Sequence, residues 1–182
     1  DLGDGVTCLE FTTKRNTFDD GVLEMLERGI ALTAERFRAM VVYNDGPDFS
    51  LGANLGLALF AANVAAWDQI ELLVAAGQRA YRALRAAPVP VVVAPAGMAL
   101  GGGCEILLHA PAVQAHAETY CGLVEAGVGL VPAWGGCAEL LQRASAHPSP
   151  RRSPRYRDSV RALLAQAAAL RDRPGGPMPP VM

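Results

Sequence analysis

Residues 96–108, AGMALGGGCEILL, place three consecutive glycines directly before an apolar helical segment. Backbone N–H groups at the N-terminus of a helix can bind an oxyanion when no side chain shields them. A tight turn that only brings a helix close to a strand would also explain the glycines. Glu105 favours the first interpretation, because a carboxylate in so apolar a segment is expected to be buried. Burial raises its pKa toward neutrality, where it can transfer protons.

Strands and helices alternate along the chain around this turn. Apolar residues at every second position, or in short continuous runs, predict strands, and apolar residues three and four apart predict helices. The predicted strands cover residues 6–11, 40–43, 89–94 and 112–117. The predicted helices cover residues 19–38, 57–84 as one or two helices, and 137–143, and residues 97–108 are predicted to be a glycine turn that opens an apolar helix. This alternation predicts an α/β fold in which at least part of the sheet is parallel.

The composition is that of one ordinary domain. Of the 182 residues, 51% are hydrophobic and 19% are charged, which supplies a sizeable core and excludes a disordered or fibrous chain. The formal net charge of −2 provides no basic field to attract nucleic acid or an anionic membrane. The apolar runs are too short for a membrane span, and the start DLGDGV lacks a secretory signal. We therefore expect a cytoplasmic protein whose partner is a small molecule or another subunit.

The cysteines and histidines do not stand at the spacings of a metal site. Cys8, Cys104, Cys121 and Cys137 lie in apolar contexts, so we expect them to be reduced, small, buried hydrophobes. The nucleotide-binding motifs GxxxxGK[ST] and GxGxxG and the serine-hydrolase motif GxSxG are absent from the sequence. We expect no metal, no dinucleotide and no serine nucleophile.

The chain is predicted to divide into a core and a C-terminal extension. The core covers residues 1–143, and a Pro/Arg-rich loop or linker covers residues 144–157. The basic side chains of the linker could touch a phosphate, although its low apolar content fits a solvated linker better. Residues 158–182 are expected to form a helix, over residues 158–170, followed by a tail. We expect this C-terminal region to be truncated.

A second carboxylate stands in a segment of small and apolar residues. Glu125 is the only charged residue of residues 122–132, GLVEAGVGLVP, although a surface glutamate would also fit this pattern. A weaker signal is residues 49–54, FSLGAN, where Gly52 lets the chain turn and could aim the amide of Ala53 at a ligand.

Taken in order, these motifs resemble the crotonase, or enoyl-CoA hydratase/isomerase, superfamily. The resemblance extends over residues 2–143. It rests on the strand at 89–94, on AGMALGGGCE at 96–105, on VEAGVGLVP at 124–132, and on Gly135-Gly136. The sequence GANLGLALF at 52–60 looks most like the hydratase module that is fused to 3-hydroxyacyl-CoA dehydrogenases in bacteria.

The resemblance implies a fold, an assembly and a ligand. The fold is the crotonase spiral of ββα units, and the assembly is a homotrimer or hexamer that binds an acyl-CoA thioester. Coenzyme A is then part of the substrate, and no separate cofactor is expected. Because this chain lacks a dinucleotide fingerprint, any dehydrogenase partner or domain lies outside it.

The resemblance also implies the catalytic roles. Carried over by position, the backbone N–H groups of Ala53 and Gly102 form the oxyanion hole, and Glu105 and Glu125 are the two catalytic carboxylates. Such amides polarise a thioester carbonyl as enolate charge develops, and a carboxylate pair delivers water to C3 and a proton to C2. The expected activity is an enoyl-CoA hydratase of fatty acid β-oxidation, acting as a module of a multifunctional 3-hydroxyacyl-CoA dehydrogenase.

Further residues are expected to contact the substrate. Gly52 and Gly101 lie in the two segments that carry the oxyanion amides, and Trp134 is expected to line or narrow the acyl pocket. Lys14 and Arg15 follow the first strand and are candidates for the CoA phosphates, although exposed basic residues are commoner than ligands.

Two other functions are left open by the sequence. An enoyl-CoA isomerase would shuttle a proton with Glu125 alone, and the retention of Glu105 favours hydration over this alternative. A non-catalytic crotonase module that only supports a dehydrogenase partner is favoured by the short C-terminal region.

Overall fold

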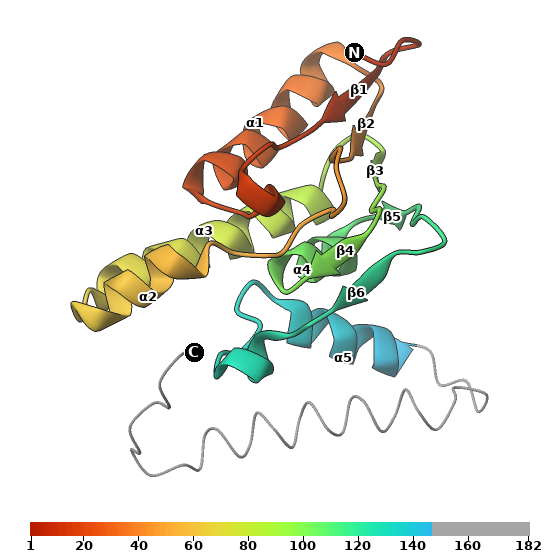
Figure 1. Ribbon diagram of the computed structural model, residues 1–182. Helices are drawn as coiled ribbons and strands as arrows, with labels where there is room; N and C mark the ends of the chain where they lie inside the picture. The colour runs from red at the N-terminus through yellow and green to blue at the C-terminus, as the bar shows by residue number, and fades with distance from the viewer. Residues whose placement is uncertain (147–182) are drawn as a thin grey trace.

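The computed structural model describes residues 1–146, which form two parallel sheets (Figure 1). The main sheet has the order β1-β2-β3-β5, with strands β1 (Val6–Leu9), β2 (Ala39–Val42), β3 (Val91–Val93) and β5 (Ala112–Val113). The second sheet consists of β4 (Met98–Leu100) and β6 (Tyr120–Gly122). All of these pairings are parallel, so the predicted α/β fold is confirmed.

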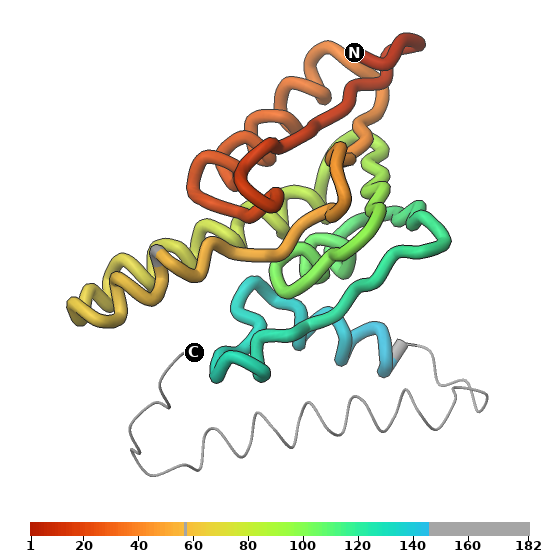
Figure 2. The backbone as a smooth tube through the Cα atoms, viewed as in Figure 1, coloured from red at the N-terminus to blue at the C-terminus, as the bar shows by residue number. Residues whose placement is uncertain are grey.

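Helices connect the strands and pack against one another. They are η1 (Lys14–Asn16), α1 (Asp20–Arg36), α2 (Leu55–Asn63), α3 (Trp67–Arg85), α4 (Gly102–His109), η2 (Glu125–Val128) and α5 (Gly136–Ala146). Helix α3 packs against α1 and α4, and α5 packs against α4. Figure 2 shows that α2 and the first half of α3 form a hairpin that projects from the rest of the chain. No helix within residues 1–146 is long and apolar enough to cross a membrane.

Helix α1 begins and packs as its sequence predicts. The carboxylate of Asp19 caps its N-terminus by accepting a hydrogen bond from the N–H of Val22 at 2.9 Å, an interaction worth about 1 kcal/mol. Val22 and Leu26, one turn apart, are both buried. Gly29 allows α1 to approach β1 closely, because a Cβ at this position would overlap the side chain of Leu9.

Three aromatic side chains join distant segments under the glycine turn. Phe18, Tyr81 and Trp134 contact one another edge to face, with ring centroids 5.4–5.9 Å apart. They come from the segment before α1, from α3 and from the loop before α5. Such contacts add about 0.5–1.5 kcal/mol each to the burial of the rings. The cluster fixes the segments that carry the candidate site.

The structure defines two of the predicted segments more closely. Residues 98–100, predicted as part of the glycine turn, form strand β4, because they pair with β6, a tertiary contact that a three-residue pattern cannot reveal. The segment 57–84 contains two helices, α2 and α3. They separate at Ala65, whose φ of 56° is left-handed and incompatible with a continuous helix.

The boundaries near the C-terminal end also differ from the prediction. The strand predicted at 112–117 is limited to the two residues of β5, and β6 was not predicted. Helix α5 extends to Ala146, so residues 144–146 are helical rather than part of the expected linker. The rest of the linker, the helix at 158–170 and the tail lie outside the described residues.

The expectation that all four cysteines are buried is wrong for most of them. Cys104 is buried in α4, and Cys8 is half-buried. Cys121 in β6 and Cys137 in α5 are exposed, because within the described residues nothing covers the outer faces of these two elements. Apolar sequence neighbours therefore did not predict burial here.

Candidate active site

The three glycines form a sharp turn between β4 and α4. Gly101 precedes the helix with a φ of 54° and a ψ of −121°, a conformation that favours glycine. A Cβ on Gly102 would lie 2.6 Å from the ring of Trp134, so the turn also needs glycine for close packing. The turn therefore needs glycine both for its backbone conformation and for its close packing.

Two backbone amides meet at this turn. The chain before α2 runs beside β4, where the backbone carbonyl of Ser50 accepts a hydrogen bond from the N–H of Leu100 at 2.9 Å. The Cβ position of Gly102 is 3.5 Å from the amide nitrogen of Ala53. Within residues 1–146, neither the N–H of Ala53 nor that of Gly102 donates to a protein acceptor. Two unused donors therefore lie side by side, as an oxyanion hole requires.

Gly52 makes the approach of the two segments possible. Its φ is +91°, and a Cβ there would lie 2.8 Å from the carbonyl oxygen of Leu100 and 3.0 Å from the nitrogen of Gly102. Any larger residue would push the two donor segments apart.

Glu105 lies in the first turn of α4, with only 2% of the residue exposed. Its Oε1 accepts hydrogen bonds from the backbone N–H of Trp134 at 3.0 Å and of Gly136 at 2.8 Å. Burial raises the pKa of Glu105 to about 7; these hydrogen bonds oppose the rise, and the nearby Glu125 adds to it. Both protonation states are therefore accessible near neutral pH.

Glu125 lies on η2 and also approaches the turn. Its Oε1 is 3.1 Å from the Cβ position of Gly101. Its Oε2 is buried and has no hydrogen-bond partner among the described residues. Burial raises the pKa of this carboxyl as well. The structure thus brings together Glu105, Glu125 and the two amides, residues that are up to 72 positions apart in the sequence.

The other residues expected at the site have different surroundings. Trp134 is only 4% exposed, and its ring packs on Gly102 and against α3, so its side chain is a core group behind the turn. Lys14 is exposed on η1. The guanidinium of its neighbour Arg15 pairs with Asp48 at 3.1 Å, and the backbone carbonyl of Arg15 accepts a hydrogen bond from the N–H of Leu51, so η1 borders the segment that leads to Ala53.

Tyr81 was missed by the sequence analysis. Its hydroxyl donates to the carbonyl of Gly102 at 2.8 Å from within α3, and its pKa is raised well above the usual value by burial and by the charge of Glu105. A tyrosine at an apolar helix position resembles any core residue, and only the tertiary contact shows that it supports the turn.

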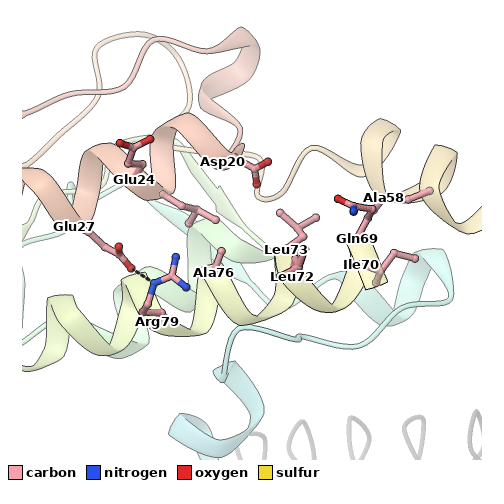
Figure 3. A pocket seen from close by; sticks show the side chains of 12 residues that line it. Asp20, Glu24, Glu27, Ala58, Gln69, Ile70, Leu72, Leu73, Ala76 and Arg79 are labelled. Atoms are coloured by element: carbon pink, nitrogen blue, oxygen red, sulfur yellow. Dashed lines mark hydrogen bonds and ion pairs between the residues drawn. The ribbon is translucent and has the colours of Figure 1, made fainter. Parts of the chain in front are cut away.

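Two other features of the described chain do not form the site. A groove of about 480 Å³ lies between α1, α2 and α3, and none of the expected site residues lines it (Figure 3). Within residues 1–146, no cluster of three or more His, Cys, Asp or Glu side chains could hold a metal ion.

Comparison with known proteins places this geometry in a family. A "Probable 3-hydroxyacyl-CoA dehydrogenase" from Bacillus subtilis is 39% identical over 140 residues, which cover 77% of this chain and 18% of that protein. A "Fatty acid oxidation complex subunit alpha" from Idiomarina loihiensis is 32% identical over 142 residues, covering 75% of this chain and 19% of that protein. The chain thus spans about a fifth of the length of the curated relatives it matches.

Solved structures agree with the sequence comparison. An enoyl-CoA hydratase from Polaromonas sp. JS666 superposes with a TM-score of 0.72 at 21% identity, over 93% of this chain and 75% of that one. This similarity confirms the crotonase fold expected from the sequence. The family model described as enoyl-CoA hydratase/isomerase matches residues 3–148. The chain belongs to the enoyl-CoA hydratase/isomerase family.

Proposed function

We propose that this chain is an enoyl-CoA hydratase, a module of a larger fatty-acid-oxidation enzyme that adds water to 2-enoyl-CoA thioesters. The observation that carries the proposal is the placement of Glu105 and Glu125 beside one turn that has two unused backbone donors. Acyl-CoA hydration needs these groups together, because negative charge develops on the thioester oxygen while two protons move.

The two amides would stabilise the enolate. When water attacks C3, the electron pair of the double bond moves toward the thioester carbonyl, and the N–H groups of Ala53 and Gly102 donate hydrogen bonds to its negatively charged oxygen. One such donor is typically worth about 3 kcal/mol of transition-state stabilisation. Because the donors are backbone groups in a packed turn, they need no rearrangement when the charge develops.

The two carboxylates would divide the proton transfers. Oε1 of Glu105 is held by two N–H groups that favour its ionised form, so Glu105 is suited to accept a proton from the attacking water. Oε2 of Glu125 has no partner in the described chain and is suited to deliver a proton to C2 of the enolate. A positioned acid or base contributes about 10²- to 10⁴-fold to the rate.

The substrate and assembly follow from the same proposal. Coenzyme A enters as part of the thioester, with Lys14 and Arg15 near its phosphates, and no separate cofactor takes part. The name of the Bacillus subtilis relative supports a dehydrogenase portion in the same enzyme, and that of the Idiomarina loihiensis relative supports a place in a fatty acid oxidation complex. We also propose a trimeric or hexameric assembly and a cytoplasmic location.

Hydration of crotonyl-CoA tests the proposal. The loss of the conjugated-thioester absorbance is followed with the unmodified chain and with Glu105→Gln and Glu125→Gln, each of which is expected to lower kcat at least about 100-fold. Turnover that is unchanged in both variants would reject the catalytic assignment. Hydration lost but isomerisation of a 3-enoyl-CoA retained in Glu105→Gln would assign hydration to Glu105 and isomerisation to Glu125. An unmodified chain that isomerises but does not hydrate would identify an isomerase, and an unmodified chain without either activity would identify a supporting module.

A further inference from the structure

One face of α3 carries polar side chains that contact the candidate site from behind. Gln78, Tyr81 and Arg85 are three and four residues apart, so they project from the same side of the helix. Tyr81 contacts the glycine turn, as described above. Gln78 and Arg85 instead contact the loop before α5 and the first turn of that helix.

The loop at 133–136 is what holds the carboxylate of Glu105. Its two N–H groups, from Trp134 and Gly136, both donate to Oε1 of Glu105. Nε2 of Gln78 donates to the carbonyl of Ala133 at 2.8 Å, immediately before the first of these donors. The start of the loop is therefore tied to α3.

The other end of the loop is tied to α3 by an ion pair. Arg85 binds the carboxylate of Glu139, whose residue is only 8% exposed. The N–H of Glu139 in turn donates to the carbonyl of Gly135 at 3.0 Å, within the loop. Both ends of the segment that binds Glu105 are thus fixed to one helix face.

A buried histidine completes this contact. His109 donates its Nδ1 proton to the backbone carbonyl of Glu105 at 2.9 Å, and its Nε2 lies 4.0 Å from Oε1 of Glu139. A Cβ on Gly135 would lie 3.0 Å from the imidazole ring. The histidine therefore fills the space between the backbone of Glu105 and the loop.

We propose that Gln78 and Arg85 are positioning residues, which act through the loop at 133–136 to keep both N–H donors on the carboxylate of Glu105. The inference rests on the proposed function for its catalytic meaning. The hydrogen bonds themselves belong to the fold and can be measured without turnover.

Other ionisable groups also face Glu105. They are Tyr81 of α3, Glu125 of η2, Cys137 of α5, and Cys104 and His109 of its own helix. Changing Gln78 alters no charge, so its effect on Glu105 isolates the geometry of the loop from electrostatics. Arg85 carries a charge and therefore serves as the second variant rather than the first.

The test is a titration of Glu105 by NMR in the full chain labelled with ¹³C at the glutamate carboxyl groups. Its resonance is assigned by its absence in Glu105→Gln. Gln78→Ala and Arg85→Ala are each expected to raise the pKa of Glu105 by about one unit, a tenfold change in ionisation constant, because weaker N–H donors stabilise the ionised form less. In the hydratase assay, the same variants are expected to lower kcat with KM little changed.

Arg79→Ala is the matched control. Arg79 lies on the same helix but points to α1, where it pairs with Glu27 at 2.8 Å (Figure 3). An unchanged pKa of Glu105 in Gln78→Ala would overturn the proposal, and so would an equal shift in Arg79→Ala. If Arg85→Ala does not fold, Gln78→Ala decides alone. Failure of crotonyl-CoA hydration by the unmodified chain would instead refute the proposed function and leave the titration readable.

Discussion

Glu105 and Glu125 both lie beside the glycine turn, but the chain holds them in different ways. Glu105 comes from a buried helix and accepts two backbone hydrogen bonds. Glu125 comes from a 3-10 turn that has no buried residues, and one of its oxygens has no partner in the described chain. The difference indicates that the fold orients Glu105 in advance, whereas Glu125 keeps an oxygen available for a substrate.

The largest expected difference is between alanine substitutions of a glycine in the turn beside Glu105 and of a glycine in η2, which carries Glu125. Gly102→Ala places a Cβ 2.6 Å from the ring of Trp134, so the turn must shift. We expect kcat for crotonyl-CoA hydration to fall about 10²- to 10³-fold and unfolding free energy to fall by about 1–3 kcal/mol. Gly127→Ala in η2 meets no atom within 4 Å and should change stability by less than about 0.5 kcal/mol. Equal losses of kcat and of unfolding free energy in the two variants would contradict the difference between the tightly packed glycine turn and η2.

The pH dependence of stability should show the burial of Glu105. Its folded-state pKa is raised to about 7 from 4.5, so the folded state binds this proton more tightly than the unfolded state. This contribution to stability is complete below about pH 4.5 and is lost as the pH rises through about 7. It corresponds to at most about 3 kcal/mol.

Urea unfolding at pH 5 and pH 8 measures this contribution. Glu105→Gln should be more stable than the unmodified chain at pH 8, and the difference should shrink at pH 5. Glu125→Gln should show the same direction with a smaller difference, because Glu125 is less buried. If the unmodified chain were more stable than Glu105→Gln at pH 8, the hydrogen bonds to ionised Glu105 would stabilise the fold by more than its burial destabilises it.

Removing the Tyr81 hydroxyl should weaken only the region of the glycine turn and Glu105, and not the segment that carries Glu125. Tyr81→Phe leaves the buried carbonyl of Gly102 without its donor, at an expected cost of about 1–2 kcal/mol in unfolding free energy. We expect kcat to fall more than KM changes, because the adjacent oxyanion turn loosens. Denaturant unfolding together with steady-state kinetics measures both effects. A variant that loses neither stability nor kcat would remove Tyr81 from the account.

The smallest expected effect is a difference in reactivity between two cysteine thiols. Burial raises the pKa of the Cys104 thiol to about 12, whereas Cys121 is exposed on β6. The thiolate is the reactive form, so iodoacetamide at pH 8 should label Cys121 long before Cys104. Mass spectrometry of the peptides reads the order, and early labelling of Cys104 would mean that the first turn of α4 opens readily.

The sequence predicted the parts of the molecule that are encoded locally. The alternation of elements led to the α/β fold, the apolar segment after the glycine run pointed to Glu105, and the apolar segment at 122–132 pointed to Glu125. Their catalytic roles came from the family resemblance. Strands β4 and β6 could not be predicted, because each has three residues and exists only through the other. Gln78 and Arg85 were missed for a similar reason, since a polar residue on a long helix is usually solvated and only the tertiary contacts show otherwise.

The role of Trp134 could not be predicted from its position in the sequence. Its place in the sequence suggested a side chain that lines the acyl pocket, but the ring packs in the core and the backbone N–H binds Glu105. Which part of a residue faces a site depends on the path of the loop, and that path is set by contacts with α3.

A crystal structure with acetoacetyl-CoA tests the central claim most directly. We expect the thioester oxygen to lie within hydrogen-bond distance of the amide nitrogens of both Ala53 and Gly102, with the acyl carbons between Glu105 and Glu125. A thioester bound away from this turn, or oriented with its oxygen toward neither amide, would contradict it.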